Sequence, residues 1–141
     1  MMRKYMRNNR LLLPSLPIFM AAALLAGCQP APTEETVEQR AQARWDHFSE
    51  RNFEAAWEYY SPGFRQMTAR EDFALDMRNR PLRWHDAQVN SAECDEDRCT
   101  VAVSVTYQPT GASGPQSQMR MTRDIDEQWV RINDRWWYVT N

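Results

Sequence analysis

The sequence predicts an α+β domain in which three amphipathic helices precede four β-strands. Apolar residues recur at helical spacing between positions 36 and 80, and they alternate with polar residues from about position 82 onward. With 141 residues, of which 43% are hydrophobic and 26% are charged, the chain has the length and composition of one globular domain. We therefore expect a single α+β domain over residues 36–141.

The N-terminal segment predicts export. The basic stretch "MMRKYMRNNR" is followed by an apolar run at positions 11–27, which contains prolines at positions 14 and 17. A bilayer-spanning helix needs about 20 apolar residues, so this short and interrupted run does not favour a membrane span. A basic start, an apolar middle and a small-residue end are typical of a secretory signal peptide. We predict a signal peptide over residues 1–27.

The end of the apolar run, "LAGC" at positions 25–28, resembles the lipobox of bacterial lipoproteins. The resemblance implies cleavage between Gly27 and Cys28, a lipid on the Cys28 sulfur, and a short tether over residues 28–35. Several acyl chains together give a stable anchor. Gln29 replaces the aspartate that favours inner-membrane retention, which implies the outer membrane of a Gram-negative bacterium, facing the periplasm. The alternative is a chance cysteine in an ordinary signal peptide.

The charge distribution argues against a nucleic-acid partner. Four of the 17 basic residues precede the apolar run and all 19 acidic residues follow it, so the domain itself is acidic. It has no basic stripe that would neutralise phosphates. We expect the membrane as one partner, through the anchor on Cys28, and a small apolar ligand or an envelope protein as the other.

The cysteine count fits an exported lipoprotein. Lipidation of Cys28 would remove the odd cysteine, which leaves Cys94 and Cys99 in a compartment where disulfides persist. A strand-like segment follows Cys99, so we expect a hairpin closed by a Cys94–Cys99 disulfide, which would contribute about 2 kcal/mol. The alternative is a metal site on the acidic residues 95–97, but no calcium-loop pattern follows them. We expect no metal.

The first helix begins at a capping box formed by Thr36 and Gln39. Its apolar stripe, which we expect to be buried, consists of Val37, Ala41, Trp45 and Phe48. Its other side, which we expect to face solvent, carries Arg40, Gln42, Arg44 and Glu50.

Two further helices are expected before position 81. Asn52 can cap the second helix, and "SPGF" at positions 61–64 predicts the turn that ends it. A second capping box, at Thr68 and Glu71, opens the third helix, and Pro81 ends it. The inward residues of the two helices are expected to be Phe53, Ala56, Trp57, Tyr60, Phe73, Ala74 and Met77.

The four strands follow from alternation, and we place them at residues 84–89, 99–107, 119–132 and 136–139. The apolar positions of the third strand change phase, which predicts a bulge in it. Asn133 and Asp134 suit a tight turn before the last strand. Because Trp136 and Trp137 are adjacent, they should point to opposite faces of the sheet, and we expect one of them to be exposed.

The layout of the domain resembles the nuclear transport factor 2-like superfamily. The resemblance rests on Trp45 and Phe48, on the segment "NFEAAWEYYSPGFRQ", and on a terminal hairpin that contains Trp129 and "WWY" at positions 136–138. It covers roughly residues 36–141. It implies three N-terminal helices packed on a curved four-stranded antiparallel sheet that forms a cone.

The resemblance also suggests where an active site would lie. Enzymes of that superfamily place acidic residues and a tyrosine or histidine inside the cone, and the residues of this kind are His85, Asp86, Asp124 and Tyr59 or Tyr60. A buried carboxylate with a raised pKa would serve as a general base. These residues form no recognisable catalytic constellation, so an isomerase or hydratase is our alternative hypothesis only.

The six tryptophans suggest a core and a pocket lining. We expect Trp45, Trp84 and Trp129 to line any pocket, and we expect no cofactor. The leading hypothesis is a non-enzymatic, membrane-anchored binding module of the cell envelope. A structural accessory of a larger envelope assembly is a third hypothesis.

Overall fold

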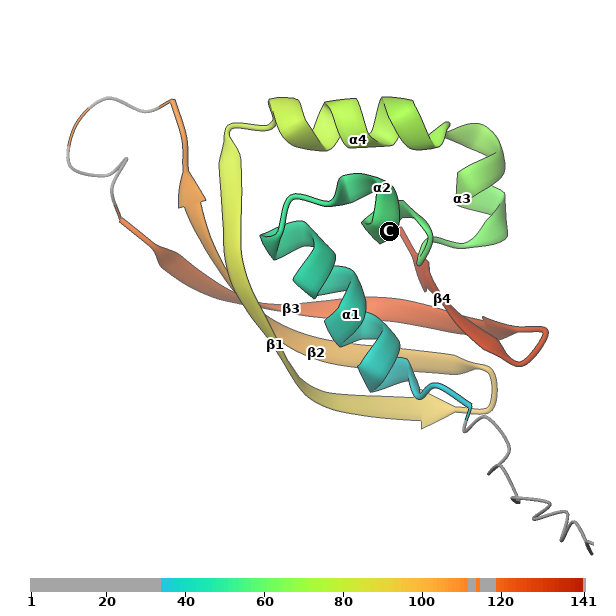
Figure 1. Ribbon diagram of the computed structural model, residues 1–141. Helices are drawn as coiled ribbons and strands as arrows, with labels where there is room; N and C mark the ends of the chain where they lie inside the picture. The colour runs from blue at the N-terminus through green and yellow to red at the C-terminus, as the bar shows by residue number, and fades with distance from the viewer. Residues whose placement is uncertain (1–33, 112–113, 115–118, 141) are drawn as a thin grey trace, which may run out of the picture. The chain divides into compact units, whose positions relative to one another are not determined.

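The computed structural model describes residues 34–111, 114 and 119–140. The predicted signal peptide, Cys28 and the tether up to position 33 lie outside the described residues. Figure 1 shows helices preceding strands along the chain: α1 Val37–Ser49, α2 Phe53–Trp57, α3 Pro62–Met67, α4 Arg70–Asn79, β1 Leu82–Asp95, β2 Arg98–Pro109, β3 Met121–Ile132 and β4 Arg135–Val139. Among the described residues, no helix is long and apolar enough to cross a membrane.

The first helix begins where the sequence predicts. The Thr36 backbone N–H donates to Gln39 Oε1 over 2.9 Å, and the Gln39 N–H donates to Thr36 Oγ1 over 3.3 Å, which completes the capping box. The predicted apolar stripe is buried. Arg40 and Arg44 are also buried, at 2% and 3% exposure, so the prediction that they face solvent is wrong.

The prediction of three helices is also wrong, because the structure has four among its described residues. The Ser61 hydroxyl accepts the Phe64 N–H, and Pro62 occupies the first turn of α3. A capping serine followed by proline is a helix start, so "SPGF" opens a helix instead of only ending one. The predicted capping box at Thr68 is absent, since α4 has Ala69 at its N-cap position and no side-chain cap.

The strands form one antiparallel sheet in the order β1-β2-β3-β4. The β2–β3 register is continuous, so the predicted bulge in the third strand is wrong. The register shifts lie in β1, at His85 and Asn90. The phase change in β3 has another cause: Val130 and Ile132 fall on the face of the strand opposite to Ile125 and Trp129, and Ile132 is 40% exposed.

The β1–β2 and β3–β4 hairpins are closed in different ways. Cys94 and Cys99, which the sequence paired, face each other in the β1–β2 register and are joined by a disulfide. Asn133 and Asp134 both have positive φ, of 53° and 58°, between β3 and β4. Two consecutive residues with positive φ are typical of the tight turn that the sequence predicts there.

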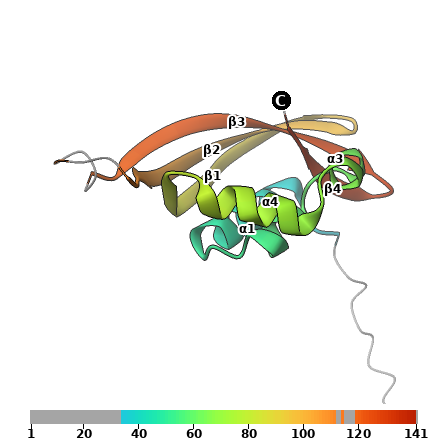
Figure 2. The same cartoon turned by 90° about the horizontal axis from the view of Figure 1, so that it is seen from above.

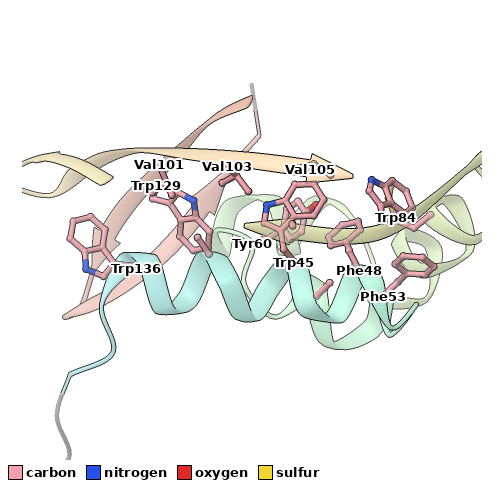
Figure 3. Packing of buried hydrophobic residues seen from close by; sticks show 14 of the residues in the cluster. Trp45, Phe48, Phe53, Tyr60, Trp84, Val101, Val103, Val105, Trp129 and Trp136 are labelled. Atoms are coloured by element: carbon pink, nitrogen blue, oxygen red, sulfur yellow. The ribbon is translucent and has the colours of Figure 1, made fainter. Parts of the chain in front are cut away.

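The helices cover one face of the sheet, and Figure 2 shows the sheet arching over α1 and α4 with its other face uncovered. Aromatic and valine side chains fill the layer between α1 and the strands (Figure 3). Trp136 and Trp137 are both buried, at 9% and 8% exposure, so the expectation that one would be exposed is wrong. The guanidinium groups of Arg65 and Arg135 cover the Trp137 ring, at 4.7 and 4.8 Å.

Side chains of α1 bond to backbone groups in both outer strands. In β1, the Gln42 side chain donates to the Ala87 carbonyl over 2.8 Å and accepts the Val89 N–H over 3.0 Å. In β4, Arg40 Nε donates to the Trp136 carbonyl over 2.6 Å. These contacts occupy backbone groups that an additional strand would otherwise bind.

Candidate functional site

A pocket of about 730 Å³ lies between the helices and the covered face of the sheet. Residues of α1, α3, α4, β1, β3 and β4 line it, and most of its wall is apolar or aromatic: Trp45, Phe48, Phe64, Phe73, Met77, Leu82, Trp84 and Ile125. A second pocket of about 360 Å³ shares Trp45, Leu82, Trp84 and Ile125 with it. The volume of the first pocket is in the range that holds a small molecule.

The polar centre of the larger pocket is an ion pair between Arg44 of α1 and Glu127 of β3. Arg44 Nη1 donates to Glu127 Oε1 over 2.7 Å, and Nη2 donates to the Tyr60 hydroxyl over 3.1 Å. Both charged side chains are almost completely buried, at 4% and 2% exposure. Such a pair persists only when each charge is compensated at close range.

Glu127 accepts hydrogen bonds from two indoles as well. Trp45 Nε1 donates to Glu127 Oε1 over 2.9 Å, and Trp129 Nε1 donates to Oε2 over 3.1 Å. Three N–H donors therefore satisfy the buried carboxylate, which is how a charge is kept inside a protein. The pair also ties α1 to the middle of the sheet.

Aromatic rings surround the Arg44 guanidinium. Its carbon lies 3.9 Å from the centre of the Tyr138 ring and within 5.1 Å of the Trp45, Phe48 and Tyr60 rings. Burial by itself acts to lower the pKa of Arg44, but Tyr60, Glu127 and Tyr138 outweigh it and the pKa is raised. The guanidinium therefore keeps its charge. Burial also raises the pKa of Tyr138, so its phenol stays neutral.

Charged residues at the mouth of the pocket come from α4 and the residue after it. Asp72, Asp76 and Arg80 contribute to the pocket wall, and Arg80 Nη2 pairs with Asp76 Oδ2 at 2.9 Å. The backbone carbonyl of Thr68, which also lines the pocket, accepts the Trp57 indole N–H over 3.0 Å. The pocket thus has an apolar wall, a neutralised pair at its base and a mildly acidic mouth.

The structure brings together two of the three tryptophans expected to line a pocket. Trp45 and Trp84 line both pockets. Trp129 lines neither of them and reaches the site only through its hydrogen bond to Glu127. The indole of Trp129 therefore helps to hold Glu127 in place without lining the pocket itself.

The residues weighed as acid–base groups are mostly outside the pocket. Asp86 and Asp124 are exposed, and His85 bonds to Gln108 over 3.0 Å. Tyr59 lies 4.8 Å beneath the Arg40 guanidinium, away from the pocket lining. Of the group, only Tyr60 lines the pocket. Sequence reasoning missed Arg44 and Glu127, which are its central polar residues.

The described residues contain no group of three or more histidine, cysteine, aspartate and glutamate side chains that could hold a metal ion. The polar groups that the pocket does offer are N–H and O–H donors and carboxylates in an aromatic setting. Chemically, such a site can hold an organic molecule by apolar contact and orient it by a few hydrogen bonds.

Comparison with known proteins finds no matching family model and no curated sequence that is similar. The fold is similar to the solution structure of a SEC-C motif containing protein from Rhodopseudomonas palustris, with a TM-score of 0.59, 14% identity, and coverage of 76% of this chain and 77% of that one. A crystal structure of a SEC-C motif containing protein from Psychrobacter arcticus gives a TM-score of 0.59, 12% identity, and coverage of 76% and 60%. The chain thus spans less than two thirds of the second protein, and likeness at these identities shows the fold alone.

These comparisons correct the predicted fold class, a nuclear transport factor 2-like cone with three helices. The chain is α+β, with four helices before a four-stranded antiparallel sheet and more residues in strands than in helices among those described. The solved structures that it resembles are described as SEC-C motif containing proteins. The prediction failed because it rested on the order and texture of elements, which do not identify one family.

Proposed function

We propose that this protein is a lipoprotein, anchored to the outer membrane through Cys28, whose domain is a non-enzymatic binding module facing the periplasm. The observation that carries the binding role is the 730 Å³ pocket, which combines an aromatic wall with a buried and compensated ion pair. A pocket of this size with a few convergent polar groups is the usual form of a small-molecule site.

Binding fits the pocket better than acid–base chemistry does. A general acid or base works best when its pKa lies near the operating pH. The pKa of Arg44 and that of Tyr138 are both shifted upward, away from neutrality, and Glu127 is held by three donors. His85 and Asp86, the groups of the alternative enzyme hypothesis, do not line the pocket. The groups that do line it are suited to holding a ligand.

The binding role is tested with N-phenyl-1-naphthylamine, a neutral apolar fluorophore. We expect the folded domain to bind about one molecule and to enhance its fluorescence, because the pocket wall is aromatic. Thr68→Trp places an indole at the pocket wall and should abolish most of the signal. Thr122→Trp is the matched control, since Thr122 is exposed on the uncovered face of the sheet. Equal binding by the two folded variants would contradict a ligand in this pocket.

The anchor is supported by the lipobox and is tested separately. Cells that express the full chain are labelled with radioactive palmitate, and the label is expected on the parent protein. Cys28→Ala should lose the label and leave the membrane fraction. Cys94→Ala/Cys99→Ala, which removes the other two cysteines, should keep it. Label that persists on Cys28→Ala would rule out this anchor. Separation of inner and outer membranes by density then tests the location.

A further inference from the structure

The Arg44 guanidinium has hydrogen-bonding capacity that the protein leaves unused. Arginine carries five N–H donors. Nη1 bonds to Glu127 and Nη2 bonds to the Tyr60 hydroxyl. The Arg44 Nε atom is buried and has no hydrogen-bond partner among the described residues. A buried donor without an acceptor is destabilising, and a bound molecule that supplies an acceptor removes that cost.

The pocket is the cavity beside the Arg44 side chain. The Arg44 side chain lines it, and so do its two hydrogen-bonding partners, Glu127 and Tyr60. The remaining wall near the guanidinium consists of the Trp45, Phe48 and Tyr138 rings. In this apolar setting, one hydrogen bond to a ligand oxygen has a large effect on its orientation and affinity.

The charges of the pocket decide which kind of oxygen fits. Glu127 already neutralises Arg44 at 2.7 Å. At the mouth, Arg80 is paired with Asp76, and Asp72 adds a further negative charge. The titratable groups that line the pocket therefore sum to a negative charge, which repels a doubly charged phosphate or sulfate. A neutral carbonyl oxygen meets Arg44 without that cost, and a single carboxylate meets it at a smaller cost than a doubly charged group does.

We infer that the ligand is an apolar molecule with one carbonyl-type oxygen, as in an amide, an ester or a monocarboxylate, and that this oxygen accepts a hydrogen bond from Arg44. The inference rests on the proposed binding function and adds the ligand's chemical class. The apolar body packs against the rings of Trp45, Phe73 and Trp84, of which Trp45 and Trp84 are labelled in Figure 3.

A matched series of probes tests the inference on the unmodified domain. Displacement of N-phenyl-1-naphthylamine is measured with 2-methylnaphthalene, 2-naphthamide, 2-naphthoate and 2-naphthyl phosphate. We expect 2-naphthamide, 2-naphthoate or both to bind about tenfold or more tightly than 2-methylnaphthalene, and the phosphate to bind more weakly than either. Equal affinity for 2-methylnaphthalene and both oxygenated probes would overturn the inference and leave the binding function standing. Binding of no probe would overturn both.

The double variant Arg44→Met/Glu127→Gln tests the residue. It removes both charges of the pair at once, and the amide carbonyl introduced at position 127 still accepts from an indole. Circular dichroism and thermal unfolding check that it folds. We expect the oxygenated probes to fall to within about twofold of 2-methylnaphthalene, whose own affinity stays unchanged.

Arg40→Met is the matched control for the double variant, because Arg40 is an equally buried arginine of α1 outside the pocket. Its oxygen preference should equal that of the unmodified domain. An oxygen preference retained by the folded double variant would overturn the role of Arg44. The probe series on the unmodified domain decides the ligand class even if the double variant does not fold.

Discussion

Two arginines of α1, Arg40 and Arg44, lie one turn apart and are buried to the same degree, yet their surroundings differ. Their exposed fractions are 2% and 3%. Arg44 points its charge at Glu127, which is itself buried. Arg40 pairs with Glu35, whose side chain is 48% exposed, and donates to a backbone carbonyl of β4. Equal burial therefore does not mean equal electrostatic compensation.

The pKa values of the two arginines show this difference. Burial is the largest influence on both and acts to lower each pKa. For Arg40 the net shift is downward, since Glu35 compensates only in part and Arg135 opposes the charge. For Arg44 the net shift is upward. Arg44 lines the pocket and keeps its charge. Arg40 lies outside the pocket and holds the outer strand β4 through its hydrogen bond to the Trp136 carbonyl.

The largest effect is expected from Glu127→Ala, which leaves the Arg44 charge buried without its partner. Breaking a buried pair by removing one member costs about 3–5 kcal/mol of unfolding free energy. Urea denaturation followed by circular dichroism measures it. Glu127→Gln keeps acceptors for the indoles and should cost less than Glu127→Ala. Equal costs for the two substitutions would mean that the negative charge alone carries the stability, and that the acceptor and the side-chain volume that glutamine retains contribute nothing.

Arg40→Met should have a smaller effect, about 1.5–3 kcal/mol. It removes the hydrogen bond from Nε to the Trp136 carbonyl and the stacking on Tyr59, but it leaves no carboxylate buried alone among its described partners. Hydrogen exchange should show faster opening of β4 than of β2. Uniform acceleration across the sheet would contradict a local role for Arg40 at this edge.

Glu35→Ala should have a still smaller effect, at most about 1 kcal/mol, because ion pairs that reach solvent contribute little. The cost should shrink further in high salt, which screens the exposed carboxylate. A cost as large as that of Glu127→Ala would remove the distinction between the two arginines. Thermal unfolding at low and high ionic strength provides the measurement.

Much of the fold could be predicted because its signals are local. The Thr36–Gln39 capping box, the stripe of α1 and the alternation of β2 follow from neighbouring residues. The start of α3 was missed because serine and proline at positions 61 and 62 serve equally well as a turn or as a helix cap. The full length of β1 was missed because two register shifts break its alternation. The fold family could not be read from the element order.

The centre of the pocket was missed because charged residues were assigned to solvent. In α1, Arg40 and Arg44 fall at the i+3 and i+7 positions after Val37, inside the buried stripe. The positions of these two arginines within the apolar stripe of α1 were the available signal for a buried charge. Alternation places Glu127 on the same face as Ile125 and Trp129, which was the available signal for its burial. Its pairing with Arg44 could not be predicted, since the two residues lie 83 positions apart. Trp45 and Trp84 were predicted because large aromatic residues seldom stay at the surface.

The smallest expected effect is a change in stability at alkaline pH, and it depends on the two tyrosines against which the arginines stack, Tyr138 for Arg44 and Tyr59 for Arg40. Burial raises the pKa of Tyr138 and that of Tyr59, while Arg44 and Arg40 respectively act to lower them. A raised pKa in the folded state means that the stabilising contribution is complete below about pH 10, the ordinary tyrosine value, and that stability declines as the pH rises above it, because the unfolded chain ionises first. Unfolding free energy should therefore decline in the alkaline range, and Tyr138→Phe should reduce that decline. The negative charge of Glu127 raises the pKa of Tyr138 further. The negative charges of Glu35 and Asp46 do the same for the pKa of Tyr59. A decline that Tyr138→Phe leaves unchanged would show that burial does not hold this phenol in its neutral form.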